Sequence, residues 1–165
     1  MIDCYVFDID GTLADLTHRL HHIQKSPKDW DGFFNDVAKD APIPHVIRLA
    51  MVLGLGTPIV LSSGRAERTR DATMQWLNRH GLFTVVHRLY MRKDGDHRPD
   101  YQVKSEILAE MVCDGWRPIM AFDDRDQVVK MWATGLVAVL SITLSSTRHF
   151  DPLLWAETHC LVLRR

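Results

Sequence analysis

The chain has 165 residues, of which 46% are apolar and 25% are charged, and its formal net charge is −1 at pH 7. These values are typical of a soluble globular protein of about one domain and do not by themselves indicate a polyanionic partner. The three cysteines, at positions 4, 113 and 160, are isolated, which argues against a disulfide framework and against a cysteine-rich zinc site. Because there is no signal pattern and no run of about 18 apolar residues, we expect a cytoplasmic protein without a membrane segment.

Short apolar runs bounded by turn-forming residues predict five strands, at residues 4–7, 58–61, 83–86, 118–122 and 136–140. Between these runs, apolar residues recur at helical spacing, from Val46 to Leu53, Thr73 to Leu77, Val103 to Met111 and Val128 to Trp132. Strands that alternate with helices indicate a parallel sheet covered on both faces. We therefore expect an α/β fold, a Rossmann-like three-layer sandwich with a central parallel sheet.

Residues 14–42 depart from this alternation. Their mixed composition, closed by Pro42 and Pro44, predicts a small insertion of helix and loop after the first strand, close to the functional site. We expect this insertion to belong to a single domain of residues 1–165. The weakly patterned residues 141–165 predict no more than a helix near residues 153–155 and a terminal strand.

Polar side chains follow three of the predicted strands at the points where those strands end. They are Asp8 and Asp10 after the first strand, Ser63 and Arg65 after the second, and Asp123 and Asp124 after the fourth. Right-handed crossovers place the carboxyl ends of all strands at one edge of the sheet, where ligands of such folds bind. The three motifs are therefore expected to converge on one site.

The side chains predicted at this edge suit phosphoryl transfer to a carboxylate. That reaction needs a nucleophile, a proton donor for the leaving oxygen, a cation and positive groups beside the phosphoryl oxygens. Asp8 is the expected nucleophile, because an aspartate is ionised at neutral pH. Asp10, beside the turn at Gly11, is expected to protonate the leaving oxygen and then activate water. This role needs a raised pKa for Asp10, which we attribute to the neighbouring carboxylates.

A magnesium ion would offset the repulsion between these carboxylates and a phosphate dianion. Mg²⁺ prefers hard oxygen ligands, and the expected metal residues are Asp8, Asp10, Asp123 and Asp124. Ser63 can donate its hydroxyl to a phosphoryl oxygen, and Lys104 can place an ammonium charge beside it. Asp100 lies four residues before Lys104 at a predicted helix start and is expected to support that lysine.

The segment Val6-Phe7-Asp8-Ile9-Asp10-Gly11-Thr12-Leu13 resembles the first motif of the haloacid dehalogenase (HAD) phosphatases, including the threonine that favours phosphotransferases in that family. Within the family, the chain is similar to the 3′-phosphatase domain of bacteriophage polynucleotide kinase-phosphatase. The similarity covers about residues 3–140, and the matching stretches are D-I-D-G-T-L-A, S-G-R, R-P-D-Y-Q-V-K and F-D-D-R-D-Q-V-V-K-M-W. The phosphate-binding loop G-x-x-x-x-G-K-[ST] of the kinase half of that relative does not occur in this sequence, so no kinase activity is expected.

The resemblance implies the same catalytic roles for Asp8, Asp10, Ser63 and Lys104. It also implies that Asp123 and Asp124 bind the metal ion. The substrate-binding residues that it implies include Thr12, Arg19, Arg65 and Asp100. Divergence from the relative is greatest in residues 20–45, the insertion that sets specificity in this family.

The resemblance favours a 3′-terminal phosphate on DNA or RNA as the substrate, in nucleic acid end repair. An insertion of about 30 residues is too small to close over the site, and an open mouth would admit a polymer end. Tyr90 and Tyr101 are the interleaved rings that could stack on a base, and each fits equally well as a core or rim residue. The basic residues expected to follow a phosphate backbone are Arg65, Arg68, Arg70, Arg88, Arg92, Lys93 and Arg98.

Two other functions remain open from the sequence. A nucleotidase or other small-molecule phosphatase would use the same chemistry, but its activity would be indifferent to chain length and would depend only weakly on salt. A catalytically idle nucleic-acid-binding module would have no use for the nucleophile. His18 and His22 have the spacing of a metal pair but lack a recognisable third ligand, so zinc is not expected. The sequence leaves the oligomeric state undecided.

Overall fold

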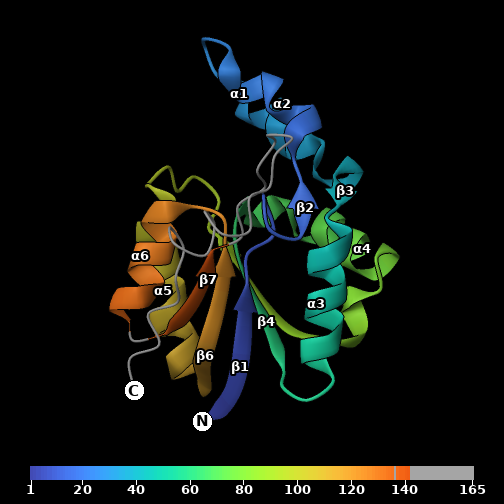
Figure 1. The fold of residues 1–165 in the computed structure, drawn as a ribbon. Helices are drawn as coiled ribbons and strands as arrows, with labels where there is room; N and C mark the ends of the chain where they lie inside the picture. Colours follow the sequence, from blue (N-terminus) through green and yellow to red (C-terminus); the bar gives the residue numbers. More distant parts are fainter. Residues whose placement is uncertain (136, 142–165) are drawn as a thin grey trace, which may run out of the picture.

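A five-stranded parallel sheet with the strand order β5-β4-β1-β6-β7 forms the centre of the protein in the computed structural model, which describes residues 1–135 and 137–141 (Figure 1). All four strand pairings are parallel. The predicted α/β Rossmann-like architecture is therefore confirmed. The strands are β1 (Ile2–Phe7), β4 (Ile59–Ala66), β5 (Val86–Arg92), β6 (Trp116–Asp123) and β7 (Ala138–Ser141).

Helices cover both faces of this sheet. α3 (Pro44–Gly54) and α4 (Arg70–Arg79) lie on one face, and α5 (Asp100–Cys113) and α6 (Asp126–Thr134) lie on the other (Figure 1). Successive side chains of a strand point to opposite faces. In β1, accordingly, Phe7 belongs to the core that includes Trp76 of α4, whereas Val6 belongs to the core that includes Trp132 of α6. Both tryptophans are buried.

The third predicted strand is displaced toward the C-terminus. Residues 83–86 were expected to form it, but Leu82–Thr84 form a 3-10 turn and β5 begins at Val86. The turn follows Gly81, whose φ of 75° reverses the chain after α4. Polar residues at the start of β5 hid the strand from pattern analysis, since an edge strand can expose His87 and Arg88 to solvent.

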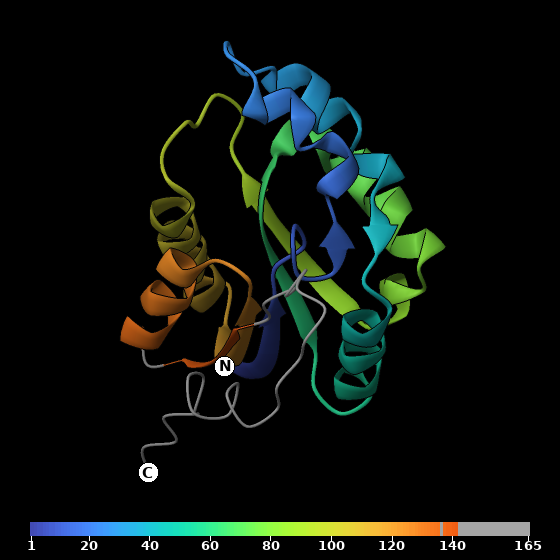
Figure 2. The same ribbon diagram turned by 45° about the horizontal axis from the view of Figure 1, so that its top comes forward.

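Residues 14–42 rise beyond the carboxyl ends of the strands (Figures 1 and 2). A short antiparallel pair, β2 (Ala14–Asp15) with β3 (Ala41–Pro42), joins this insertion to the sheet domain. Between these strands lie a 3-10 turn at Thr17–Arg19, α1 (His21–Gln24), α2 (Trp30–Asn35) and a second 3-10 turn at Val37–Lys39.

The last predicted strand is present as β7, although Leu136 itself lies outside the described residues. The helix and strand expected within residues 142–165 also lie outside them. In the described part of the chain, no helix is both long and apolar enough to cross a membrane.

The burial of Trp132 predicts a large loss of stability on truncation. Trp132→Ala should lower the free energy of unfolding by about 3–5 kcal/mol, because the indole fills the core between the sheet, α5 and α6. Val52→Ala, on the exposed side of α3, should change it by less than about 0.5 kcal/mol. Urea unfolding measures both values, and equal losses in the two variants would contradict this description of the core.

Candidate active site

Asp8, Lys104 and Asp123 form a buried ion cluster at the carboxyl edge of the sheet. The Nζ atom of Lys104 donates to Oδ1 of Asp8 at 2.7 Å and to Oδ2 of Asp123 at 2.7 Å. Asp8 directly follows β1, Asp123 ends β6, and Lys104 lies in the first turns of α5. All three side chains are buried. Parallel strand order and one crossover helix thus bring together residues separated by up to 115 positions.

A third carboxylate, Asp124, completes an acidic group. One oxygen each from Asp8, Asp123 and Asp124 lies within 4.8 Å of the others. Oδ1 of Asp124 is buried and has no hydrogen-bond partner among the described residues. Gly11 makes this approach sterically feasible, because a Cβ atom at Gly11 would lie 2.2 Å from Oδ2 of Asp124. Oxygen ligands at this spacing, one of them unpaired, fit a divalent cation.

The pKa values in this group reflect burial and crowding. Burial, and then the neighbouring carboxylates, raises the pKa of Asp8 well above its ordinary value, against the opposing charge of Lys104. Burial and the charge of Asp123 raise the pKa of Asp124 to about 6. Burial alone would lower the pKa of Lys104, but the charges of Asp8 and Asp123 outweigh it and raise that pKa. Additional positive charge would therefore favour the ionised carboxylates.

Asp10 belongs to a second, separate ion network. Its Oδ1 atom accepts hydrogen bonds from Nη2 of Arg19 at 2.7 Å and from Nε and Nη2 of Arg65 at 2.9 and 2.7 Å. Both arginines also donate to Asp40, at distances of 2.6–2.8 Å. His18 Nε2 lies 2.8 Å from the same carboxylate. Two buried arginines are thus balanced by two aspartates.

This network shifts the pKa of Asp10 in the direction opposite to the one expected. Its pKa was predicted to be raised by neighbouring carboxylates, but the prediction is wrong for this conformation. Although burial on its own opposes ionisation, the charges and hydrogen bonds of Arg65 and Arg19 lower the pKa of Asp10 to about 2. Asp10 is therefore a carboxylate in the free protein.

The other expected site residues, Ser63, Thr12 and Asp100, differ in their burial and in their partners. Ser63 is buried within β4, and its Oγ accepts a hydrogen bond from the backbone N–H of Arg65 at 3.2 Å. Thr12 is buried, and its hydroxyl has no hydrogen-bond partner among the described residues. Asp100 forms ion pairs with Arg92 and, at 2.5 Å, with Arg125.

A cavity of about 690 Å³ opens above Asp8 and Asp10. Arg19 and Arg65 were expected to contact substrate, but both guanidinium groups are fully buried behind Asp10 and neither lines this cavity. Asp100 does line it. Its other lining residues include three aromatic side chains of α2 and several basic ones, namely Trp30, Phe33, Phe34, Lys28, Arg68, Arg92, Lys93, Arg98 and Arg125.

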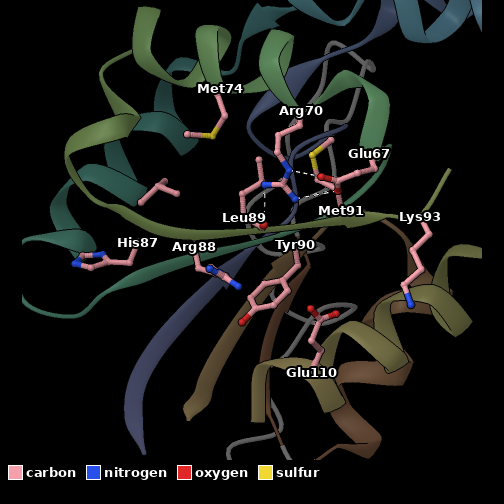
Figure 3. Close-up of a pocket in the computed structure, with 11 residues that line it drawn as sticks. Glu67, Arg70, Met74, His87, Arg88, Leu89, Tyr90, Met91, Lys93 and Glu110 are labelled. Carbon is pink, nitrogen blue, oxygen red and sulfur yellow. Dashed lines mark hydrogen bonds and ion pairs between the residues drawn. The ribbon is translucent and has the colours of Figure 1, made fainter. Parts of the chain in front are cut away.

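Several residues expected near the substrate lie elsewhere. A second cavity, of about 540 Å³, runs along the outer side of β5 (Figure 3). Arg70 and Arg88 line this second cavity, and Arg70 donates to the backbone oxygen of Leu89 at 3.2 Å. Tyr90 is buried, with its hydroxyl bonded to Asp114 at 2.7 Å. Tyr90 is therefore not available to stack on a base.

Sequence analysis missed Asp40 and the aromatic residues of α2. Asp40 belongs to no recognisable motif. It could have been found only by asking which carboxylate balances the charges of the two buried arginines. The aromatic residues carried a signal, since Trp30-Asp31-Gly32-Phe33-Phe34 places three rings in five residues of the insertion.

The sheet topology and the convergence of Asp8, Lys104 and Asp123 at its carboxyl edge match the arrangement expected from the sequence for an HAD-type phosphatase. The fold is shared with the haloacid dehalogenase-like hydrolase SP0104 from Streptococcus pneumoniae, with a TM-score of 0.63 at 11% identity over 87% of this chain and 85% of that one. The family model for the polynucleotide kinase PNKP phosphatase domain matches residues 2–144, and the chain belongs to this family. The resemblance found from the sequence is confirmed.

Two relatives of this chain are larger proteins. It is 31% identical over 128 residues to a protein of Autographa californica nuclear polyhedrosis virus described as a predicted bifunctional polynucleotide kinase/RNA ligase, covering 76% of this chain and 17% of that protein. A solved Pnkp1/Rnl/Hen1 RNA repair complex contains a chain with a TM-score of 0.73 at 23% identity, over 89% of this chain and 44% of that one. The chain thus spans less than half of these relatives.

The shared counter-charge in the second network predicts a stability defect. Asp40→Asn removes one of the two charges that balance Arg19 and Arg65, and we expect the free energy of unfolding to fall by about 3–5 kcal/mol. Asp3→Asn, which removes an exposed ion pair with Arg117, is the control and should leave the unfolding midpoint close to that of the wild type. Chemical denaturation compares the two. A wild-type midpoint for Asp40→Asn would show that the arginines do not need this carboxylate.

Proposed function

We propose that this chain is a Mg²⁺-dependent phosphomonoesterase that removes the 3′-terminal phosphate from DNA or RNA ends through an aspartyl-phosphate on Asp8. The observation that carries the proposal is the Asp8 carboxylate, which lines the large cavity and is bonded on its inner side to Lys104. Membership of the PNKP phosphatase family supports the assignment. Removal of the phosphate leaves a 3′-hydroxyl, the group that strand joining uses.

In the first step, an Oδ atom of Asp8 attacks phosphorus and the bond to the 3′-oxygen breaks. Lys104 and Ser63 are both buried and do not line the cavity, so they are proposed to stabilise the charge of the phosphoryl oxygens from behind Asp8. In the second step, water attacks the phosphorus of the aspartyl-phosphate, the bond to Asp8 breaks and inorganic phosphate leaves.

Asp10 is proposed to carry the proton in both steps. It gives a proton to the departing 3′-oxygen and then takes one from the attacking water. The low pKa of Asp10 in the free protein suits the second role. For the first role, the two negative charges of a bound phosphate monoester would raise that pKa and favour the protonated acid.

Asp8, Asp123 and Asp124 are the residues proposed to hold Mg²⁺. Asp10, also expected from the sequence, lies outside this group, and its carboxylate is paired with Arg19 and Arg65. The converging oxygens of the first three residues and the unpaired Oδ1 of Asp124 support this choice. When bound, the ion would offset the negative charge of the carboxylates and of the phosphoryl group. Arg19, Arg65 and Asp40 are proposed to position Asp10, since they touch it or its partners and do not line the cavity.

Phosphate release tests the proposed function directly. A 3′-phosphorylated oligonucleotide, a 3′-mononucleotide and an aryl phosphate are each incubated with the wild type, with Mg²⁺ or with EDTA. We expect the oligonucleotide to have the highest kcat/KM, EDTA to abolish release, and Asp8→Asn to lose at least about a thousandfold in kcat.

Other outcomes would separate the remaining functions. Preference for the small esters would retain the chemistry and overturn the polymer substrate. An absence of phosphate release from all three substrates would overturn the enzymatic function and favour an idle binding module. Circular dichroism of Asp8→Asn must match that of the wild type for its inactivity to count.

A further inference from the structure

An aromatic cluster lines the same cavity as Asp8 and Asp10. Trp30 and Phe34 of α2 are stacked, with ring centroids 6.1 Å apart and an interplanar angle of 25°. Trp30 is 44% exposed, which is unusual for so large an apolar side chain, and Phe34 is half-buried. Phe33 packs edge-on beneath both, at 5.9 and 5.5 Å. The two outer rings thus form a supported apolar surface in an otherwise polar cavity.

Contacts on both sides hold this cluster in place. Arg19, which fixes Asp10, also lies 4.2 Å from the ring centre of Phe33 and donates to its backbone oxygen at 3.4 Å. Arg68 bonds to Asp31 at 2.6 Å and lies over the ring of Phe34 at 5.4 Å. The aromatic surface is therefore fixed relative to the catalytic carboxylates before any ligand arrives.

Two lysines beside this surface have no ion-pair partner within residues 1–135 and 137–141. They are Lys28, whose Nζ lies 5.5 Å from the ring centre of Trp30, and Lys93, which follows β5. Both side chains are exposed. Arg98 lines the same cavity but is paired with Asp96 and Glu106. The lysines can therefore bind an anion without breaking an existing ion pair.

The cavity also exceeds the needs of a phosphate group. Its 690 Å³ would hold about twenty water molecules at ~30 Å³ each, whereas a phosphate group has five heavy atoms. Rings combined with free cations are the chemistry that proteins use to bind single-stranded nucleic acid, since every base has a π-face and every linkage a charge.

We propose that Trp30, supported by Phe34, is a stacking surface for the nucleobase next to the terminal phosphate of a single strand, and that Lys28 and Lys93 contact its internucleotide phosphates. This inference rests on the proposed function, because it places the terminal phosphate at Asp8. It identifies the substrate as a single-stranded end of at least two nucleotides and assigns the base contact to α2 in place of Tyr90.

Selectivity between substrates tests this surface. For Trp30→Ala, the ratio of kcat/KM for a 3′-phosphorylated tetranucleotide to that for an aryl phosphate should fall about tenfold, within the range of alanine substitutions at stacking residues. Trp30→Phe should retain most of the selectivity. Phe83→Ala removes an aromatic side chain that is 57% exposed and lies outside the cavity, so it is the matched control and should keep the wild-type ratio.

Binding distinguishes failure of this inference from failure of the proposed function. Fluorescence anisotropy of a labelled, 3′-phosphorylated oligonucleotide needs no turnover, and Trp30→Ala should weaken Kd about tenfold. Lys28→Ala should reduce the salt dependence of log Kd by about 0.7. An unchanged Kd and selectivity in Trp30→Ala, with the wild type active, would overturn the stacking surface alone. Trp30-dependent binding by a protein that hydrolyses no substrate would support the surface and overturn the catalytic function.

Discussion

The ion cluster of Lys104 with Asp8 and Asp123 is the constraint on which the site depends. A buried ammonium ion costs several kcal/mol unless it is paired, and here both partners come from strand ends distant in sequence. The cluster therefore forms only when β1 and β6 pair in parallel and α5 packs against the sheet. In return it places one positive charge among three carboxylates, so that the proposed nucleophile, the proposed metal ligands and Lys104 are held by the same set of contacts.

The network of Arg19, Arg65, Asp10 and Asp40 connects this sheet edge to the insertion. Arg65 belongs to β4, whereas Arg19 and Asp40 belong to residues 14–42, so the charges that set the pKa of Asp10 also attach the insertion to the sheet domain. Trp76 of α4 strengthens the attachment by donating its Nε1–H to the backbone oxygen of Asp40 at 2.7 Å. Through the contact of Arg19 with Phe33, the same network fixes the aromatic surface. The proposed chemistry and the proposed substrate recognition thus depend on one set of buried charges.

Most of the fold could be predicted because the strands carry apolar runs that end at polar residues, and helical patterns lie between them. β5 was misplaced because an edge strand can carry His87 and Arg88 without penalty. The direction of the Asp10 pKa could not be predicted, since it depends on which charges surround the carboxylate in space, and proximity in sequence favoured Asp8 over two distant arginines. For the same reason, the burial of Arg19 and Arg65 behind Asp10 could not be predicted. The aromatic residues of α2 were visible in the sequence, yet their place on the cavity wall depends on how the insertion returns to the sheet.

The most direct test of the central claim is to trap the phosphoryl group. The wild type is mixed with an oligonucleotide carrying a ³²P-labelled 3′-phosphate, quenched in acid within milliseconds, digested and mapped by mass spectrometry. The account predicts a base-labile phosphoryl group on the peptide that contains Asp8, appearing before free phosphate and decaying as phosphate accumulates. A phosphoryl group on a different residue, or phosphate release in the first turnover without any labelled protein, would contradict it.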